Sequence, residues 1–296
     1  MIIMSAPKAH TSPMKAVLID ISGTILIGEH AIPGAIDAIH KLQQQPNVKV
    51  LFLTNSSTSS ISLLEQLRKS GFDELAIPNI NSIMTSVSAT RNYLIQNNLR
   101  PYCLMEDTLV ETDFVGVDRN EPNCVVVGLA RSKLNYEKLN VAFRLLTKLK
   151  KADVESDTTI STPPPPRLIA ISRATHFLDS DHELSLGPGG FVTLLEQTVG
   201  VTAHVIGKPS PNFYQAAVSS LLGIEYDPSS AVMIGDDVKG DVSGALEAGL
   251  GCAILVKTGK YVTGDELGTK TGGILPSFTA ESIVEAVDYI CSNMHG

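Results

Sequence analysis

The sequence predicts an α/β fold in which helices cover a parallel sheet. Short aliphatic runs alternate with segments of helical periodicity along most of the 296 residues, an alternation typical of strands connected by helices. Polar and charged residues directly follow several of these runs, at the place where open parallel sheets bind ligands. The pattern therefore predicts one α/β domain made from both ends of the chain and interrupted by a second domain.

Two strands and two helices are predicted before residue 86. The strands are residues 15–20 (KAVLID) and 48–53 (VKVLFL), which are rich in aliphatic side chains. Pro33 is expected to open the first helix, because proline is favoured in a first turn, and Gly71 to stop the second. The side chains expected on the buried helix faces are Ile36, Ile39 and Leu42, then Ile61, Leu64 and Leu67.

The middle of the chain keeps the alternation less regularly. Strands are predicted around PYCLME (101–106), NCVVVGL (123–129) and RLIAIS (167–172), with a longer helix at 136–151. The stretch 152–166 ends in four prolines and predicts an extended, solvated loop insertion. A motif for a proline-recognising partner stays open as the alternative.

The last third returns to a strict pattern. The predicted elements are the strands 203–207, 231–235 and 252–256, a helix capped by Ser210 with Pro211 at its first position, a helix at about 241–248 and a terminal helix from about Ser282. The expected partition is a core domain of 14–86 and 200–296, an inserted domain of 87–199, and a loose N-terminal extension at 1–13.

Composition excludes several classes of function. The net charge is -8 and no long Lys/Arg run is present, which disfavours a nucleic-acid or anionic-membrane surface. No apolar stretch is long enough to span a membrane, and the N-terminal apolar run is too short for a signal peptide, so a soluble cytoplasmic protein is expected. The sequence lacks G-x-G-x-x-G and G-x-S-x-G, and Gly259-Lys260 has no upstream glycine at Walker A spacing.

Four cysteines are widely spaced, with no CxxC pair: Cys103, Cys124, Cys252 and Cys291. Neither a zinc site nor a disulfide framework is indicated. Reduced, partly buried thiols are the expectation.

Several residues that could carry chemistry follow predicted strands. They are Asp20 with Ser22, Thr54 with Asn55, Lys208, and Asp236 and Asp237 with Asp241. Each has an ordinary structural reading as a turn residue, a helix cap, a surface lysine or a solvated acidic turn. Together, carboxylates at one sheet edge would repel each other unless a cation or a proton joined them. Oxygen ligands of this kind suit Mg²⁺, and a hydroxyl and an ammonium nearby suit a phosphate.

Four segments, DISGT (20–24), LTN (53–55), GKPSPNF (207–213) and GDDVKGD (235–241), resemble in order and spacing the motifs of the haloacid dehalogenase superfamily of phosphohydrolases. The resemblance spans about residues 14–293. It implies a Rossmann-like three-layer parallel-sheet core with an inserted smaller α/β cap domain, phosphatase activity toward a small phosphorylated substrate, and Mg²⁺ as cofactor. A possible homodimer rests on the resemblance alone.

The resemblance also implies residue roles. Asp20 would be the nucleophile that forms an aspartyl-phosphate, a step that divides one difficult displacement into two easier ones. Mg²⁺ would be held by Asp20, the carbonyl of Ser22 and Asp236. The remaining roles fall to Ser22, Thr54, Asn55 and Lys208 as substrate contacts, with Lys208 also catalytic, and to Asp237 and Asp241 as groups that orient the metal's waters or Lys208.

Ser22 departs from the family pattern, which places a second aspartate there as general acid and base. A serine hydroxyl is too weak an acid for this task, and losing a general acid costs about 10² to 10⁴ in rate. The sequence therefore predicts a bias toward activated esters and P–N or P–O–P bonds. The alternative is a catalytically weak member that binds phosphate, Mg²⁺ or a protein partner.

Substrate choice is expected to lie in the inserted domain. Arg173 follows the predicted strand 167–172, and GPGG (187–190) precedes a helix, so either could face the substrate. An ordinary surface arginine remains the alternative for Arg173.

Overall fold

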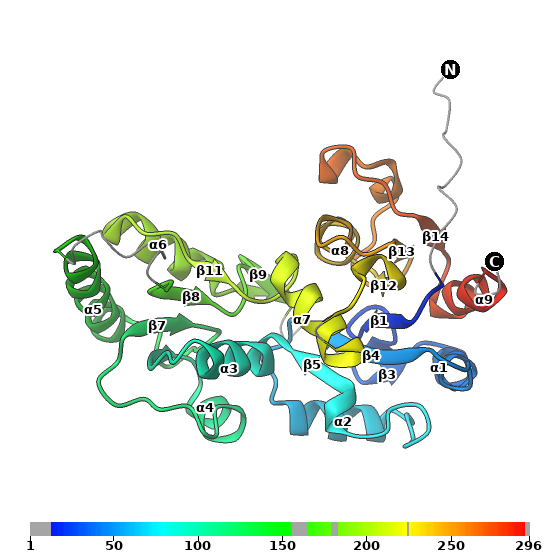
Figure 1. Ribbon diagram of the computed structural model, residues 1–296, viewed down its shortest axis with the longest axis horizontal. Helices are drawn as coiled ribbons and strands as arrows, with labels where there is room; N and C mark the ends of the chain where they lie inside the picture. The colour runs from blue at the N-terminus through cyan, green and yellow to red at the C-terminus, as the bar shows by residue number, and fades with distance from the viewer. Residues whose placement is uncertain (1–12, 156–164, 179–182, 224, 294–296) are drawn as a thin grey trace. The chain divides into compact units, whose positions relative to one another are not determined.

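The computed structural model describes residues 13–155, 165–178, 183–223 and 225–293, which form two compact units (Figure 1). Of the described residues, the first unit comprises 13–54, 60–84, 208–223 and 225–293, and the second comprises 55–59, 85–155, 165–178 and 183–207. The predicted N-terminal extension, apart from Pro13, and residues 156–164 of the predicted proline-rich loop lie outside the described residues.

The first unit is built on a parallel sheet. Its strands are β1 (Ala16–Asp20), β4 (Lys49–Thr54), β5 (Ile83–Thr85), β12 (Ala231–Gly235), β13 (Cys252–Val256) and β14 (Phe278–Ala280). In the part of the chain that the structure describes, these six strands have the order β14-β13-β12-β1-β4-β5. β1 pairs in parallel with both β4 and β12, and β13 with both β12 and β14. The predicted parallel α/β core is confirmed.

Helices cover both faces of this sheet. They are α1 (Ala35–Gln43), α2 (Ser60–Lys69), α7 (Pro211–Leu222), α8 (Gly244–Glu247) and α9 (Ile283–Asn293). α1 and α9 lie side by side (Figure 1) and bury Ile39 and Val287 in one apolar cluster with Val17 and Ile19 of β1. Successive strand residues face opposite sides, so Leu18 faces the other layer, where α7 contacts β1 and α8. The result is the three-layer arrangement.

Three details of these helices differ from the predictions. α1 begins at Ala35 with Gly34 as its N-cap, so Pro33 lies in the preceding turn and does not open the helix. Ile61 is 52% exposed, and α2 instead buries Ser60, Leu63 and Leu67. The predicted buried face was one residue off at the start of the helix, because Leu63 and Leu64 are adjacent and either one fits the helical spacing to Leu67. α7 begins at Pro211 as predicted, but the Ser210 side chain makes no capping hydrogen bond.

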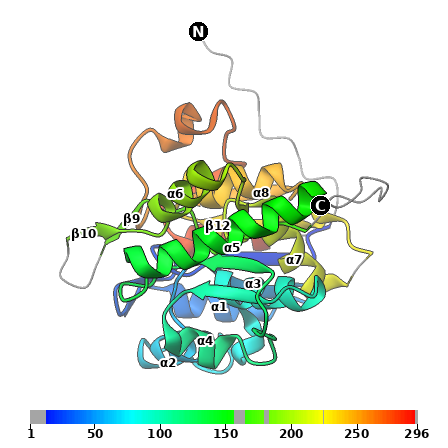
Figure 2. The ribbon, with the colours of Figure 1, turned by 90° about the vertical axis from the view of Figure 1, so that its left-hand side faces the viewer.

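The second unit contains its own parallel sheet. Its strands are β6 (Pro101–Leu104), β7 (Cys124–Val127), β8 (Leu168–Ala170) and β11 (His204–Val205), in the order β11-β8-β7-β6 within the described residues. The helices of this unit are α3 (Ser86–Gln96), α4 (Asp107–Asp113), α5 (Tyr136–Glu155) and α6 (Gly189–Val199). Figure 2 shows α5 and α6 side by side, and both pack on the sheet through Leu146 and Leu195.

Smaller elements complete the two units. Short antiparallel pairs join β2 (Leu26–Ile27) to β3 (His30–Ala31) and β9 (His176–Leu178) to β10 (Leu184–Leu186). Residues 152–155, predicted as the start of the loop, form the last turn of α5. Their sequence, ADVE, contains no proline or glycine that would end a helix.

The cysteines are free thiols, as predicted, and Cys124 and Cys252 are buried. Burial raises the pKa of the Cys124 thiol to about 12, so the reactive thiolate is scarce at neutral pH. Among the helices of the described residues, none combines the length and the apolar character needed to cross a bilayer.

Candidate active site

The candidate site begins where three neighbouring strands of the first unit end. β1 ends at Asp20, β4 ends at Thr54, and Asp236 follows the last residue of β12. Asp20 pairs in register with Leu53, and Ile19 with Ile234. Parallel pairing therefore brings the ends of β4, β1 and β12 to one edge of the sheet.

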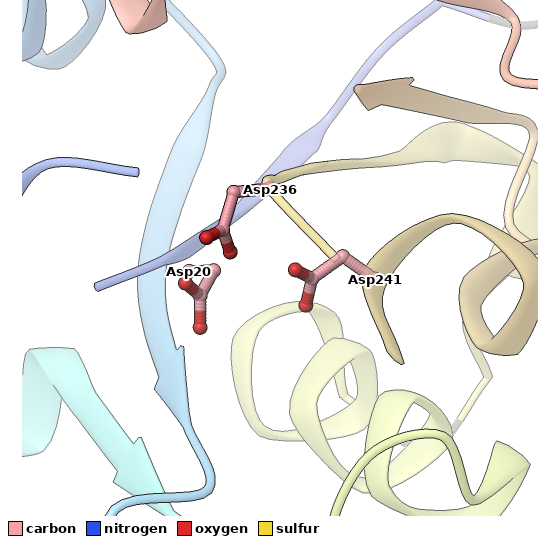
Figure 3. Close-up of side chains that lie close together, drawn as sticks. All are labelled: Asp20, Asp236 and Asp241. Atoms are coloured by element: carbon pink, nitrogen blue, oxygen red, sulfur yellow. The ribbon is translucent and has the colours of Figure 1, made fainter. Parts of the chain in front are cut away.

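Three carboxylates converge at this edge. Asp20, Asp236 and Asp241 are buried, and each offers an oxygen within 4.8 Å of those of the other two. Figure 3 shows the three side chains pointing toward one another. Burial, together with repulsion from Asp20 and Asp241, raises the pKa of Asp236 to about 7. Burial also raises the pKa of Asp241 to about 6, although Lys208 opposes the shift.

Lys208 supplies a buried positive charge between two of these carboxylates. Its Nζ donates to Asp20 Oδ1 and, at 2.7 Å, to Asp241 Oδ1. Burial alone would lower the pKa of the Lys208 ammonium, but the adjacent Asp20 and Asp241 carboxylates raise it. The ammonium therefore stays charged.

The route by which Lys208 reaches the site differs from the sequence reasoning. That reasoning placed Lys208 after a strand, 203–207, in the same series as the other candidates. The observed strand β11 pairs with β8 in the four-stranded sheet of the second unit. Lys208 is instead the first residue of the returning segment of the first unit.

Asp237 and Asp241 lie at the start of a π-helix, which has a wider turn than the α-helix predicted at about 241–248. This π-helix, Val238–Ser243, precedes α8, and Asp237 Oδ1 caps it by accepting from the amides of Lys239 at 3.0 Å and Gly240 at 2.9 Å. The Asp237 amide in turn donates to Asp241 Oδ2 at 3.0 Å. Only a glycine fits at 235, because a Cβ there would lie 2.2 Å from the Asp241 carboxyl.

The other predicted site residues occupy varied positions. Thr54 is buried at the end of β4, while Ser22 is exposed and its backbone pairs with Leu26. Asn55 is half-buried and belongs to the second unit.

Arg173 also belongs to the second unit. Its guanidinium donates to both carboxylate oxygens of Glu196, at 2.7 and 2.8 Å, and weakly to Thr193 at 3.4 Å. This bidentate pair gives Arg173 a structural partner, and its contact with a substrate stays a prediction.

The sequence reasoning missed four contacting residues. Thr24 donates to Asp20 Oδ2 at 3.3 Å, and Thr258, Gly259 and Lys260 approach the site from the loop after β13. Ligands of parallel sheets bind beyond the carboxyl ends of the strands, so the residues after β13 are candidates as well. Gly259-Lys260 lacks the Walker A spacing, and its place in the loop after β13 is the sequence signal that points to the site.

The donor set fits a hard divalent cation. Asp236 Oδ1 is buried and has no hydrogen-bond partner within the described residues, a state that costs free energy unless a ligand satisfies the oxygen. With Asp237 paired to Lys260 Nζ at 3.2 Å, four carboxylates face two ammonium groups, so ionised carboxylates leave an excess of negative charge. Oxygen donors with this charge are those that Mg²⁺ prefers.

Sequence comparisons match both ends of the chain to one group of enzymes. The family described as "Haloacid dehalogenase-like hydrolase" matches residues 17–113, and the one described as HAD-hydrolase-like matches residues 205–286. A bovine (Bos taurus) relative, "Haloacid dehalogenase-like hydrolase domain-containing protein 2", is 40% identical over 282 residues, which cover 95% of this chain and 97% of the relative.

A second relative is similar in sequence, and a solved structure is similar in fold. "Phospholysine phosphohistidine inorganic pyrophosphate phosphatase" from Mus musculus is 34% identical over 268 residues, covering 89% of this chain and 90% of that protein. A p-nitrophenyl phosphatase from Archaeoglobus fulgidus has a similar fold, with a TM-score of 0.77 over 94% of this chain and 100% of that chain, at 24% identity.

Proposed function

Because this chain belongs to the haloacid dehalogenase-like hydrolase family and is a phosphatase, we propose that it acts with Mg²⁺ through an aspartyl-phosphate on Asp20. The observation that carries the proposal is the buried arrangement of Asp20, Lys208 and Asp241 beside Asp236 Oδ1, which has no hydrogen-bond partner in the described part of the chain. Among the described residues, Lys208 pairs with Asp20 and Asp241 but not with Asp236, and desolvation makes a buried carboxylate without a cation costly.

Asp20 is the proposed nucleophile. One of its carboxylate oxygens forms a bond to phosphorus while the bond from phosphorus to the leaving group breaks. Water then attacks the phosphorus, inorganic phosphate leaves, and the carboxylate is restored. Thr24 and Lys208 hold the two oxygens of Asp20 in place before the reaction, so little reorientation is needed when the substrate arrives.

Lys208 and Asp241 act as a pair. The ammonium neutralises charge that spreads over the transferring phosphoryl group, and Asp241 keeps that ammonium beside Asp20. Thr54 and Asn55, at and after the end of β4, are the proposed contacts for a phosphoryl oxygen. Asp237, which caps the π-helix, orients Asp241 through its backbone amide.

Asp20, Asp236 and the carbonyl of Ser22 are the groups that would hold Mg²⁺. When bound, the ion neutralises negative charge as one anion approaches another. Two observations on the described residues support this assignment: Asp236 Oδ1 has no hydrogen-bond partner among them, and their carboxylates outnumber their ammonium groups at the site.

We further propose that Ser22 biases the enzyme toward leaving groups that need little protonation. Ser22 is exposed, and its hydroxyl cannot replace a carboxylic acid at neutral pH. Aryl phosphates, pyrophosphate and phosphoramidates such as phospholysine fit this limit better than alkyl phosphates do. The second unit would be the cap that selects among them. Cytoplasmic location and a homodimer stay predictions.

Release of inorganic phosphate tests the proposal. We expect turnover of p-nitrophenyl phosphate, pyrophosphate and phospholysine that chelation of Mg²⁺ abolishes, and slow turnover of glycerol phosphate. Ser22→Asp should raise turnover of the alkyl ester by about 10²-fold and leave the aryl ester nearly unchanged. Turnover that survives full chelation would refute the Mg²⁺ requirement, and equal turnover of alkyl and aryl esters by the wild type would refute the bias.

A further inference from the structure

The turn Thr258–Gly259–Lys260, which follows β13, contacts both segments that carry the proposed Mg²⁺ ligands. It is closed by a hydrogen bond from the Tyr261 amide to the Thr258 carbonyl at 3.0 Å. Thr258 Oγ1 donates to the carbonyl oxygen of Gly23, the residue after Ser22. The Lys260 backbone amide donates to Asp236 Oδ2 at 2.6 Å. One short turn thus joins the loop after β1 to the residue after β12.

Two glycines close around the same carboxylate oxygen. A Cβ added to either Gly23 or Gly259 would lie 2.0 Å from Asp236 Oδ2, so no other residue fits at either position without moving Asp236. Both glycines also have positive φ, 88° and 53°, a region that side chains disfavour. Oδ2 is therefore enclosed and hydrogen-bonded, whereas Oδ1 is buried without a partner among the described residues.

We propose that the turn 258–260 is a positioning element that ties down Asp236 Oδ2 and leaves Oδ1 as the single oxygen for the cation. The inference rests on the proposed function, because it assumes that Asp236 binds a divalent ion. The donor to Asp236 is a backbone amide, so the lysine side chain is not the positioning group. The Lys260 ammonium instead contacts Asp237 at 3.2 Å.

Holding one oxygen has a consequence for metal choice. Ca²⁺ takes six to eight oxygens and accepts carboxylates through both oxygens, whereas Mg²⁺ demands near-octahedral geometry with fewer ligands. A carboxylate restricted to one oxygen therefore favours Mg²⁺. Releasing Oδ2 from the turn is expected to weaken Mg²⁺ binding more than Ca²⁺ binding.

Calorimetric titration of the substrate-free protein with Mg²⁺ and with Ca²⁺ tests the inference. Gly259→Ala places a methyl against Asp236 Oδ2, and we expect it to weaken Mg²⁺ binding by about 10- to 100-fold, as loss of a supporting contact does in other metal sites. Gly272→Ala is the matched control, because Gly272 has a similar φ of 66° but no atom of the described residues within 4 Å of an added Cβ. It carries the same backbone strain and should change affinity less than about twofold.

Milder variants keep the test decisive if Gly259→Ala folds poorly. Thr258→Val removes only the hydroxyl that reaches Gly23 and should weaken Mg²⁺ binding about threefold, with Thr258→Ser restoring it. Lys260→Met keeps the backbone amide and should not weaken Mg²⁺ binding. Equal Mg²⁺ affinity in Gly259→Ala and Gly272→Ala, or in Thr258→Val and wild type, would overturn the inference while leaving the proposed function intact. A wild type that binds no Mg²⁺ would overturn both.

Discussion

The two parallel sheets of this protein end in very different ways. In the six-stranded sheet, β1 ends at Asp20 and β12 is followed by Asp236, and both carboxylates are buried. In the four-stranded sheet, the residues after β6, β7 and β8 are Met105, Gly128 and Ile171, which are apolar or lack a side chain. An added Cβ on Gly128 would lie 3.0 Å from Ile171 Cδ1 and 3.4 Å from Met105 Cγ, so this edge is closed by packing.

The difference shows that the carboxyl edge of a parallel sheet forms a site only where the sequence places charged or polar side chains there. At the four-stranded sheet, apolar burial stabilises the unit, at roughly 25 cal/mol per Å² of area removed from water. At the six-stranded sheet, each buried ion costs several kcal/mol unless it is paired. The buried charges at the edge of the six-stranded sheet therefore lower stability relative to apolar packing. The experiments below measure this difference between the two edges.

The largest expected effect comes from neutralising the charge at the end of β1. Asp20→Asn keeps the shape of the side chain and one acceptor for Lys208 but removes the nucleophilic carboxylate. We expect phosphate release to fall by about 10³-fold or more, as removal of a nucleophile does elsewhere. Release of p-nitrophenol with saturating Mg²⁺ measures it. Activity within tenfold of wild type would remove Asp20 from the nucleophile's role.

The next effect compares a buried ion pair of the first unit with an exposed one of the second. Lys208→Met leaves Asp20 and Asp241 buried without their cation, and we expect it to lower the free energy of unfolding by about 3 kcal/mol. Arg173→Met breaks the more exposed pair with Glu196 and should cost about 1 kcal/mol or less. Urea unfolding with a chelator present measures both. Equal losses of unfolding free energy in Lys208→Met and Arg173→Met would mean that burial does not make the Lys208 ion pairs more important for stability than the Arg173 pair.

A third effect concerns pH in the absence of divalent ions. The folded-state pKa values of Asp236, about 7, and Asp241, about 6, lie above the usual 3.8. A raised pKa means that the folded state holds its proton longer, so the associated stability is complete below about pH 4 and is lost as pH rises through 6 and 7. We expect the chelated protein to lose about 2 to 3 kcal/mol from Asp236 between pH 5 and 7.5, with a smaller further loss from Asp241.

Urea unfolding at the two pH values measures this loss, and two comparisons locate its source. Asp236→Asn should reduce the loss to the smaller part due to Asp241, because an amide does not titrate. Saturating Mg²⁺ should flatten the profile, since a bound cation favours the ionised carboxylate. A chelated wild type that is more stable at pH 7.5 than at pH 5 would contradict the assignment.

The strand ends could be predicted from the sequence because they depend on local patterns. The aliphatic runs 231–235 and 252–256 coincide with β12 and β13, and parallel pairing then requires Asp20 and Asp236 to be neighbours. Residues that reach the site through loops were less predictable. Lys208 arrives from a connection after the edge strand of the other sheet, and no periodicity reports which sheet a two-residue strand joins.

The turn 258–260 shows a second limit of sequence reasoning. Its two contacts join residues that are 235 and 24 positions apart in the chain, Thr258 with Gly23 and Lys260 with Asp236. One of the donors is a backbone amide, which every residue except proline possesses. No residue type marks such a contact, so only the packing of β13 beside β12 reveals it.

The smallest effect is expected at the closed edge of the four-stranded sheet. Gly128→Ala adds a methyl beside Ile171 Cδ1 and Met105 Cγ, flexible ends of side chains that can shift by a few tenths of an ångström. We expect a loss of about 1 kcal/mol in unfolding free energy, typical of mild overpacking. The kcat/KM for p-nitrophenyl phosphate should stay within about twofold of wild type, because no charged group directly follows β7.

The same substitution at Gly235 would instead place a carbon 2.2 Å from the Asp241 carboxyl and displace the partner of Lys208. Comparable losses of kcat/KM in Gly128→Ala and Gly235→Ala would contradict the assignment of catalysis to the edge of the six-stranded sheet and of packing alone to the edge of the four-stranded sheet.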